Sequence, residues 1–198
     1  MRKKPTQARA GATVDAIVEA AAQVLQKEGE EGLTTARVAA RAGVSIGSIY
    51  QYFPNKDAIL LALIRKEREA IAADIARTIA AIDPQSGEAI VDAVIATLVA
   101  AFRPRRKRRR LVAMMAALSA DRDDSGVILR DRIGDLIVAV SNRHPDMTAR
   151  PLTPTAAYVL TRAVLGAIRS AVVENAKILD DPEFEEELCR LARGYLRG

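Results

Sequence analysis

The stretch from Leu33 to Lys56 predicts two short helices joined by a tight turn, and it constrains the fold more than any other part of the sequence. Thr34 and Ser45 belong to the residue types that cap helix N-termini, and apolar residues at helical spacing follow each of them. Gly43 stands where the first helix would end, where a left-handed conformation is common and least costly for glycine. We therefore expect a helix-turn-helix unit, which can present its second helix to the major groove of DNA.

This stretch resembles the N-terminal domain of the tetracycline-repressor (TetR) family of one-component transcription regulators. The resemblance rests on the turn Ala42-Gly43-Val44-Ser45, on the segment GSIYQYF at residues 47–53, and on Asn55-Lys56 at the start of a long helix. It covers about 45 residues from about Val14, whereas the rest of the chain resembles the family only in length and helical plan.

By this resemblance, several side chains of the helix-turn-helix unit would contact DNA. Those that would hold phosphates are Thr35, Ser48, Tyr50, Tyr52 and Lys56, and those that would face base edges are Ile46, Gly47 and Gln51. Ser45, on the surface of the second helix, is a further DNA-binding candidate, and the alternative for Gln51 is a solvated side chain. Ala36 and Ile46 replace polar base-reading residues of some family members, so the sequence preference of relatives does not transfer.

The composition predicts an all-α protein, because aromatic residues make up only 4% of the chain and β-branched alternation is rare. Three of the seven aromatic residues lie between Tyr50 and Phe53, which favours a role for them beyond packing. We divide the 198 residues into a basic N-terminal arm (1–12), a three-helix helix-turn-helix DNA-binding domain (13–57) and a helical effector-binding and dimerisation domain (58–198), with about nine helices in all. The arm could lie along DNA or be a solvated tail.

Apolar residues at three- and four-residue spacing predict the other helices. Their expected ranges are 14–28, 56–82, 86–102, 108–119, 125–143, 155–179 and 183–196. The long helix at 56–82 would lead from the DNA-facing unit into the second domain.

The last helix carries an apolar stripe of Phe184, Leu188, Leu191 and Tyr195 at four-three-four spacing. By the resemblance, the last two helices pair with their copies in a second subunit, so we interpret the stripe as a dimer interface. The alternative is a stripe folded back on its own chain.

An effector pocket is expected between the central apolar helices, with Phe102, Met114, Met115 and Tyr158 as candidate lining, although each could equally fill the core. Arg162 lies one helical turn from Tyr158 and, if it points inward, would favour a carboxylate or phosphate on the effector. A structural ion pair or a solvated side chain is the alternative for Arg162.

The net charge of +5 depends on seven basic residues between Arg103 and Arg110, without which it would be negative. Total charge is therefore a poor argument for nucleic-acid binding, and the run itself is either a solvated loop or an auxiliary contact to DNA phosphates.

The residue inventory argues against an enzyme, a cofactor or a metal site. His144 is the only histidine and Cys189 the only cysteine, and no nucleophile, phosphate-loop or metal-ligand motif is present. The acidic turn at 121–124 lacks the glycine and glutamate of a calcium loop. One cysteine excludes an intramolecular disulfide, and no signal peptide or membrane span is expected, which together indicate a cytoplasmic protein.

These features leave three hypotheses for the function. The first is a ligand-responsive transcriptional repressor that binds a palindromic DNA operator as a homodimer and responds to a small-molecule effector. The second is a constitutive DNA-binding dimer without an effector. An enzyme of unknown type is a remote third.

Overall fold

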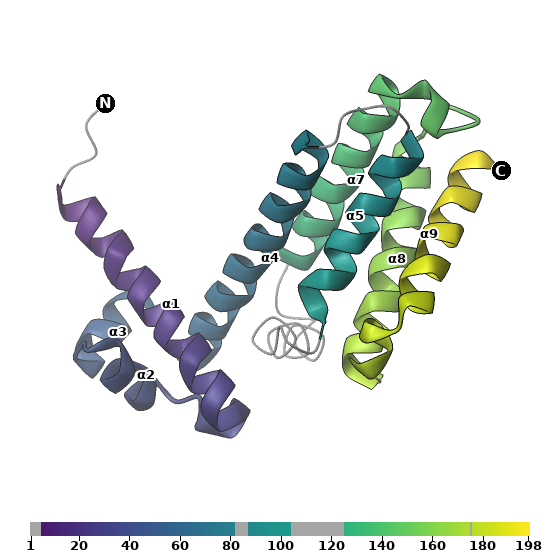
Figure 1. The fold of residues 1–198 in the computed structure, drawn as a ribbon. Helices are drawn as coiled ribbons and strands as arrows, with labels where there is room; N and C mark the ends of the chain where they lie inside the picture. The colour runs from purple at the N-terminus through teal and green to yellow at the C-terminus, as the bar shows by residue number, and fades with distance from the viewer. Residues whose placement is uncertain (1–4, 82–86, 104–124, 175) are drawn as a thin grey trace. The chain divides into compact units, whose positions relative to one another are not determined.

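The computed structural model describes residues 5–81, 87–103, 125–174 and 176–198. Within these ranges the regular elements are α-helices and short 3-10 helices, and none is a strand, so the predicted all-α class is confirmed (Figure 1). The chain divides into two compact units, Met1–Lys66 and Glu67–Gly198, so that the boundary falls inside helix α4 rather than at residue 57. The helix predicted at 108–119 lies outside the described residues.

Unit 1 contains α1 (Pro5–Gly32), α2 (Thr35–Ala42), α3 (Ile46–Tyr52) and the first part of α4 (Lys56–Ala81). Helix α1 begins well before the predicted start at residue 14, so residues 5–12 are helical and the expected flexible arm is wrong there. Proline is well suited to a first helical turn, and the alanine, glutamine and arginine that follow it favour a helix. Thr13 does not cap the helix, because its hydroxyl donates to the Arg9 carbonyl one turn earlier, at 3.0 Å.

The caps predicted at Thr34 and Ser45 are confirmed, and Asn55 caps α4 in the same way. Thr34 Oγ1 accepts from Arg37 N at 3.3 Å, Ser45 Oγ from Ser48 N at 3.0 Å, and Asn55 Oδ1 from Ala58 N at 2.9 Å. Gly43 takes the left-handed conformation with φ 69° and ends α2. These local contacts set where α2, α3 and α4 begin, and thereby which side of α3 packs inward.

The core of unit 1 forms where α1, α2, α3 and α4 meet. Its fully or nearly fully buried side chains include Ile17, Ala21, Leu25, Val38, Ile49, Phe53, Ile59 and Leu63. Ion pairs at the edge join the elements: Lys66 Nζ lies 3.0 Å from Asp15 Oδ1, and Arg37 lies 2.8 Å from Glu28 Oε2. Ile49 is thus the residue that anchors α3, and the rest of that short helix faces outward.

Unit 2 is a bundle of the end of α4 with α5 (Gly87–Phe102), α7 (Ser125–Arg143), α8 (Pro154–Glu174) and α9 (Pro182–Arg197), plus the 3-10 helices η2 (Pro145–Met147) and η3 (Ala176–Asp180). The helix predicted at 155–179 ends as an α-helix at Glu174, and its last residues belong to η3. Asp181 caps α9 and accepts from Glu183 N at 3.0 Å.

Helix α8 is long and apolar enough to cross a membrane by length and composition alone. It packs into the core of unit 2, however, and 44% of its apolar window is buried there. Core helices of soluble proteins have the same properties, so α8 is weak evidence for a membrane span.

Alanine at Gly87 should destabilise unit 2, because α5 begins in close contact with η2. A Cβ at Gly87 would lie 2.3 Å from Met147 Cβ and 2.7 Å from its Cα, and Gly87 N already donates to Asp146 Oδ2 at 3.0 Å. We expect Gly87→Ala to lower the free energy of unfolding by roughly 1–3 kcal/mol, measured by urea denaturation. Gly134→Ala is the control, since its Cβ would meet only Ala157 Cβ at 4.0 Å. Equal stability of the two variants would contradict this packing.

Candidate functional site

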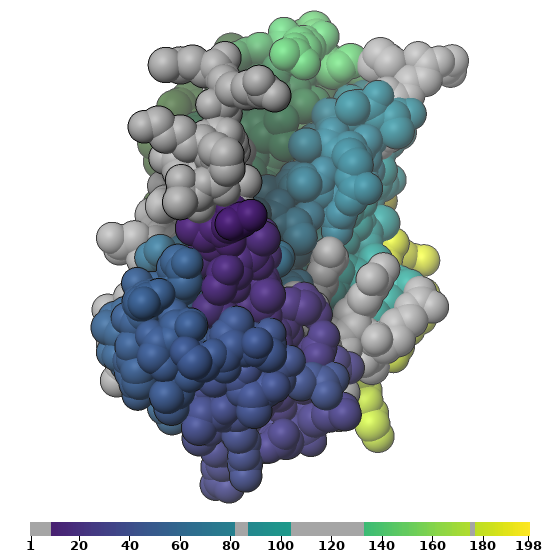
Figure 2. All heavy atoms as spheres, turned by 90° about the vertical axis from the view of Figure 1, so that its left-hand side faces the viewer, coloured from purple at the N-terminus to yellow at the C-terminus, as the bar shows by residue number. Residues whose placement is uncertain are grey.

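The outer face of α3 exposes large side chains that no packing explains. Ile46 is 48% exposed and Tyr50 is 54% exposed, although both belong to residue types that usually pack. Tyr52 and Gln51 are exposed beside them. Together with α2, this helix forms part of the solvent-facing surface of unit 1 (Figure 2). A surface of this kind, polar and aromatic on a rigid helix, is suited to contact with another molecule.

Two hydroxyl pairs order this surface. Thr35 Oγ1 lies 3.5 Å from the Tyr50 hydroxyl, so the structure brings together two of the predicted phosphate-binding residues from α2 and α3. Ser45 Oγ lies 2.8 Å from Ser48 Oγ while it also accepts from Ser48 N. Ser45 is therefore engaged first in capping α3, and its hydroxyl is less available to DNA than the sequence suggested.

Gly47 has no evident role inside the chain. Its φ is not positive, and a Cβ there would meet only Ser45 Oγ at 3.7 Å, which is an ordinary contact. It lies exposed in the first turn of α3. A residue without a side chain at this position allows close approach of another molecule to the helix backbone.

Positive charge is placed at the edge of the surface. Lys56 is exposed at the start of α4, where the helix N-terminus adds to the attraction for an anion. The basic residues of α2 are held by neighbours: Arg37 pairs with Glu28, and Arg41 Nε donates to Gln23 Oε1 at 2.7 Å. Of the predicted DNA-binding residues, Thr35 and Tyr50 thus lie together, Ser45 caps α3, and the solvent-exposed ones include Ile46, Gly47, Gln51, Tyr52 and Lys56.

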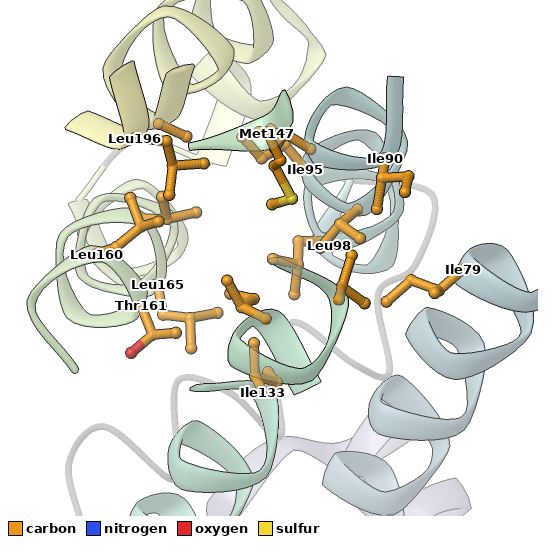
Figure 3. Close-up of a pocket in the computed structure, with 16 residues that line it drawn as sticks. Ile79, Ile90, Ile95, Leu98, Ile133, Met147, Leu160, Thr161, Leu165 and Leu196 are labelled. Carbon is orange, nitrogen blue, oxygen red and sulfur yellow. The ribbon is translucent and has the colours of Figure 1, made fainter. Parts of the chain in front are cut away.

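Unit 2 contains an apolar cavity of about 50 Å³ between its helices (Figure 3). Among the described residues, the lining is Ile79 of α4, Ile90, Val91, Val94, Ile95 and Leu98 of α5, Ile133, Ile137 and Val140 of α7, Met147 of η2, Leu160, Thr161, Val164 and Leu165 of α8, and Ala192 and Leu196 of α9. Thr161 supplies the one side-chain oxygen of this set, and it donates to the Ala157 carbonyl at 2.8 Å.

Three of the residues predicted to bind an effector, Phe102, Tyr158 and Arg162, are not among the described residues that line this cavity. Phe102 is partly buried and packs against the core of unit 2. Tyr158 is 53% exposed, and the Arg162 guanidinium lies over its ring, 3.3 Å from the centroid. Met114 and Met115 lie outside the described residues. On α8, the positions that face the cavity are Leu160, Thr161, Val164 and Leu165. Tyr158 and Arg162 lie at other angles around the helix axis and therefore do not line the cavity.

The stripe predicted on α9 divides between two environments. Leu188 is buried in the core of its own unit, and Phe184 and Tyr195 are partly buried against that core, whereas Leu191 is 47% exposed. An exposed stripe that the sequence analysis missed lies on α8, at Val159, Ala163, Gly166, Ser170 and Val173. Its four-three-four-three spacing was readable in the sequence, but its small residues gave a weak apolar signal.

Cys189 is buried, and the burial together with the nearby Asp92 carboxylate raises the pKa of its thiol to about 11. Because the thiolate is the reactive form, we expect Cys189 in the folded protein to react very slowly with a disulfide reagent at pH 8 and fast only after denaturation. The rate should rise about tenfold for each pH unit above 8, as the thiolate fraction does, and level off only near pH 11. Rapid reaction of the folded protein at pH 8 would contradict this environment.

The remaining candidates do not form a site in the described part of the chain. Arg103 donates to Glu185 Oε2 at 2.9 Å, while residues 104–110 of the basic run and the acidic turn at 121–124 lie outside the described residues. His144 precedes η2 and makes no side-chain cap hydrogen bond there. Within the described ranges, no group of three or more histidine, cysteine, aspartate and glutamate side chains could hold a metal ion.

Comparison with known proteins agrees with this arrangement. Residues 17–63 match the family described as bacterial regulatory proteins, tetR family. The chain is 47% identical over 57 residues to the HTH-type transcriptional repressor DrrR1 of Streptomyces coeruleorubidus, a match that covers 28% of this chain and 21% of that repressor. The chain therefore matches only about a fifth of the length of this relative.

Solved structures share the fold over nearly the whole chain. A transcriptional regulator from Rhodococcus sp. Rha1 superposes with a TM-score of 0.70 at 23% identity, covering 92% of this chain and 95% of that one. The multidrug binding protein EbrR, complexed with malachite green, gives a TM-score of 0.68 at 24% identity, covering 92% and 97%. The outward-facing surface of α3 lies within the match over residues 17–63, so this part of the chain resembles the DNA-binding domain of the tetR family of bacterial regulatory proteins, and the chain as a whole shares the fold of the solved structures.

Proposed function

We propose that this protein is a cytoplasmic transcriptional repressor that binds a palindromic DNA operator as a homodimer and releases it when a small molecule occupies the cavity of unit 2. The observation that carries the proposal is the outer face of α3, which exposes Ile46, Tyr50 and Gln51 on a helix anchored by buried Ile49. Recognition helices of helix-turn-helix proteins enter the major groove with such a face. The repressor DrrR1, similar over 57 residues, supports the assignment to repression.

The residues of this surface fall into two groups, one suited to DNA phosphates and one suited to base edges. Tyr50, ordered by Thr35, and Lys56 at the start of α4 suit phosphate oxygens, and these contacts would set the position of the protein on the duplex. Gln51 can form a bidentate pair with adenine, while Ile46 offers an apolar surface to the methyl group of thymine. Sequence specificity would then depend on Gln51 and Ile46, whereas affinity would depend on the phosphate contacts as well as on the base contacts.

Homodimerisation is supported by the exposed stripe of α8 together with Leu191 of α9. Both helices belong to unit 2 and lie beside each other in the bundle (Figure 1). Small residues at Ala163, Gly166 and Ser170 would allow the same helix of a second chain to approach closely, with Val159 and Val173 as larger contacts at the ends. A second copy would place a second α3 for the other half of a palindrome.

Effector response is supported by the position of Ile79. This residue lines the cavity from α4, and α4 runs without interruption from Lys56, close after α3, to Ala81. Occupation of the cavity would press on Ile79 and change the two α3 positions that fit successive turns of DNA. The EbrR structure contains malachite green, so a protein of similar fold holds a small molecule.

One observation favours the second hypothesis, a constitutive dimer that responds to no ligand, and this is the small volume of the cavity.

Selection of bound duplexes from a random DNA pool tests the proposal. We expect an enriched inverted repeat whose half-site centres are about one helical turn, roughly 10–10.5 base pairs, or a multiple of it apart. A pool without enrichment, or a motif without two-fold symmetry, would contradict it.

A further inference from the structure

The chemistry of the cavity in unit 2 defines the class of molecule that it can accept. Its described lining consists of hydrocarbon side chains, one thioether and one hydroxyl (Figure 3). That hydroxyl, on Thr161, donates to the backbone within its own helix, with the carbonyls of Ala157 at 2.8 Å and Tyr158 at 3.1 Å as acceptors. The described walls therefore present no charged group and no uncommitted hydrogen-bond donor to a ligand.

On three of the helices around the cavity, α5, α8 and α9, charged residues contact other side chains. On α5 and α9, Glu88 pairs with Arg197, and Asp92 Oδ1 lies 3.4 Å from Arg193 Nε. On α8, Arg162 stacks over the exposed ring of Tyr158. Among the described lining residues, an ionised ligand would meet no opposite charge to offset its lost hydration, which is strongly unfavourable.

The cavity is also small. Its volume of about 50 Å³ is well below the roughly 300–1,000 Å³ of sites for drug-sized ligands. An apolar cavity of about 150 Å³ stays dry and binds benzene, so this cavity has to widen to accept even a ligand of that size. Leucine and methionine side chains in the wall, at Leu98, Leu160 and Met147, can shift to admit a compact molecule more easily than β-branched ones.

We propose that the ligand of unit 2 is a compact, uncharged and apolar molecule, held without an ion pair. This inference rests on the proposed function, in which the cavity is the effector site, and it replaces the carboxylate or phosphate ligand that Arg162 suggested in the sequence.

Three probes of nearly one shape test it on the full-length protein: ethylbenzene, phenylacetate and benzylamine, which are neutral, anionic and cationic at pH 7. We expect isothermal titration calorimetry to show ethylbenzene binding once per chain and at least tenfold more tightly than either ion. Val164→Phe, which fills the cavity, should weaken ethylbenzene binding at least tenfold, and Ala192→Leu serves the same purpose if the larger change prevents folding. Ala139→Phe, on the exposed side of α7, is the matched control and should change nothing.

Different outcomes would contradict the apolar ligand class and the use of the cavity as the effector site. An ion that binds as tightly as ethylbenzene and no longer binds to Val164→Phe would overturn the apolar class while leaving the effector site in place. Ethylbenzene binding that no cavity-filling variant affects, or no binding of any probe, would overturn the cavity as a ligand site. DNA binding and dimerisation, measured without any probe, would stand in each of these cases.

Discussion

Gln51→Ala is expected to abolish base preference at one position in each half-site of the operator. Gln51 is exposed on α3, and a bidentate pair between glutamine and adenine contributes about 1–3 kcal/mol of discrimination. Because the proposed dimer would contact a base through Gln51 in both half-sites, the free-energy penalty on the cognate duplex should be about twice that of one half-site. Fluorescence anisotropy with a set of single-base variants of the selected duplex measures it.

Lys56→Gln is the matched comparison for this variant. Lys56 is exposed at the N-terminus of α4, so its replacement should weaken all duplexes by a similar factor and leave the order of preference unchanged. The slope of log affinity against log salt should become shallower by about 0.9 for each phosphate that the variant no longer neutralises. A selected motif that is the same for Gln51→Ala and the unaltered protein would contradict the base contact.

Gly166→Arg is expected to convert the dimer into monomers and to weaken operator binding severely. No atom lies within 4 Å of a Cβ added at Gly166, so a single chain can accommodate the side chain, and arginine favours the helix more than glycine does by about 1 kcal/mol. In a dimer, however, the centre of the α8 stripe would receive two bulky cations that repel each other.

Analytical ultracentrifugation checks this result, with Ala139→Arg as the control at an exposed position of α7 outside the stripe. We expect the control to remain dimeric and Gly166→Arg to sediment as a monomer that circular dichroism finds folded. A dimeric Gly166→Arg would show that the stripe of α8 is not the interface.

The helix-turn-helix was predictable because its signals are local. Thr34, Ser45 and Asn55 each cap a helix through a hydrogen bond to a nearby backbone N–H, and Gly43 adopts its backbone conformation within the turn itself. Such contacts depend little on the rest of the fold, so the residue types alone are enough to place them. The buried position of Ile49 then follows, and with it the outward face of α3.

Which residues face the effector cavity or a second subunit depends on the rotation of each helix about its own axis. The sequence defines this rotation less well than it defines helix caps. On α8, the aromatic Tyr158 and the charged Arg162 drew attention, yet the inner side of the helix is formed by Leu160, Thr161 and Val164. On α9, Leu188 could face the core or a partner by spacing alone, and tertiary packing places it in the core.

The helical conformation of residues 5–12, at the start of α1, was not predicted from the sequence. Residues 5–12 contain one basic residue, Arg9, among mostly small side chains. Such a composition is typical of flexible arms, but its alanine, glutamine and arginine are also strong helix formers. These residues extend the helix that was predicted from residue 14 onward. Extending an existing helix avoids the cost of nucleating a new one, so a weak preference for helix is enough.

Symmetric binding can be measured by comparing the selected operator with a duplex in which one half-site is scrambled. If two copies of α3 bind two half-sites as one symmetric dimer, the intact operator should bind two chains per duplex, and scrambling one half-site should weaken binding at least a hundredfold. Because this is a penalty of about 2.7 kcal/mol or more, titration of labelled duplexes resolves it readily. One chain per duplex, or equal affinity for the intact and half-scrambled operators, would contradict the account.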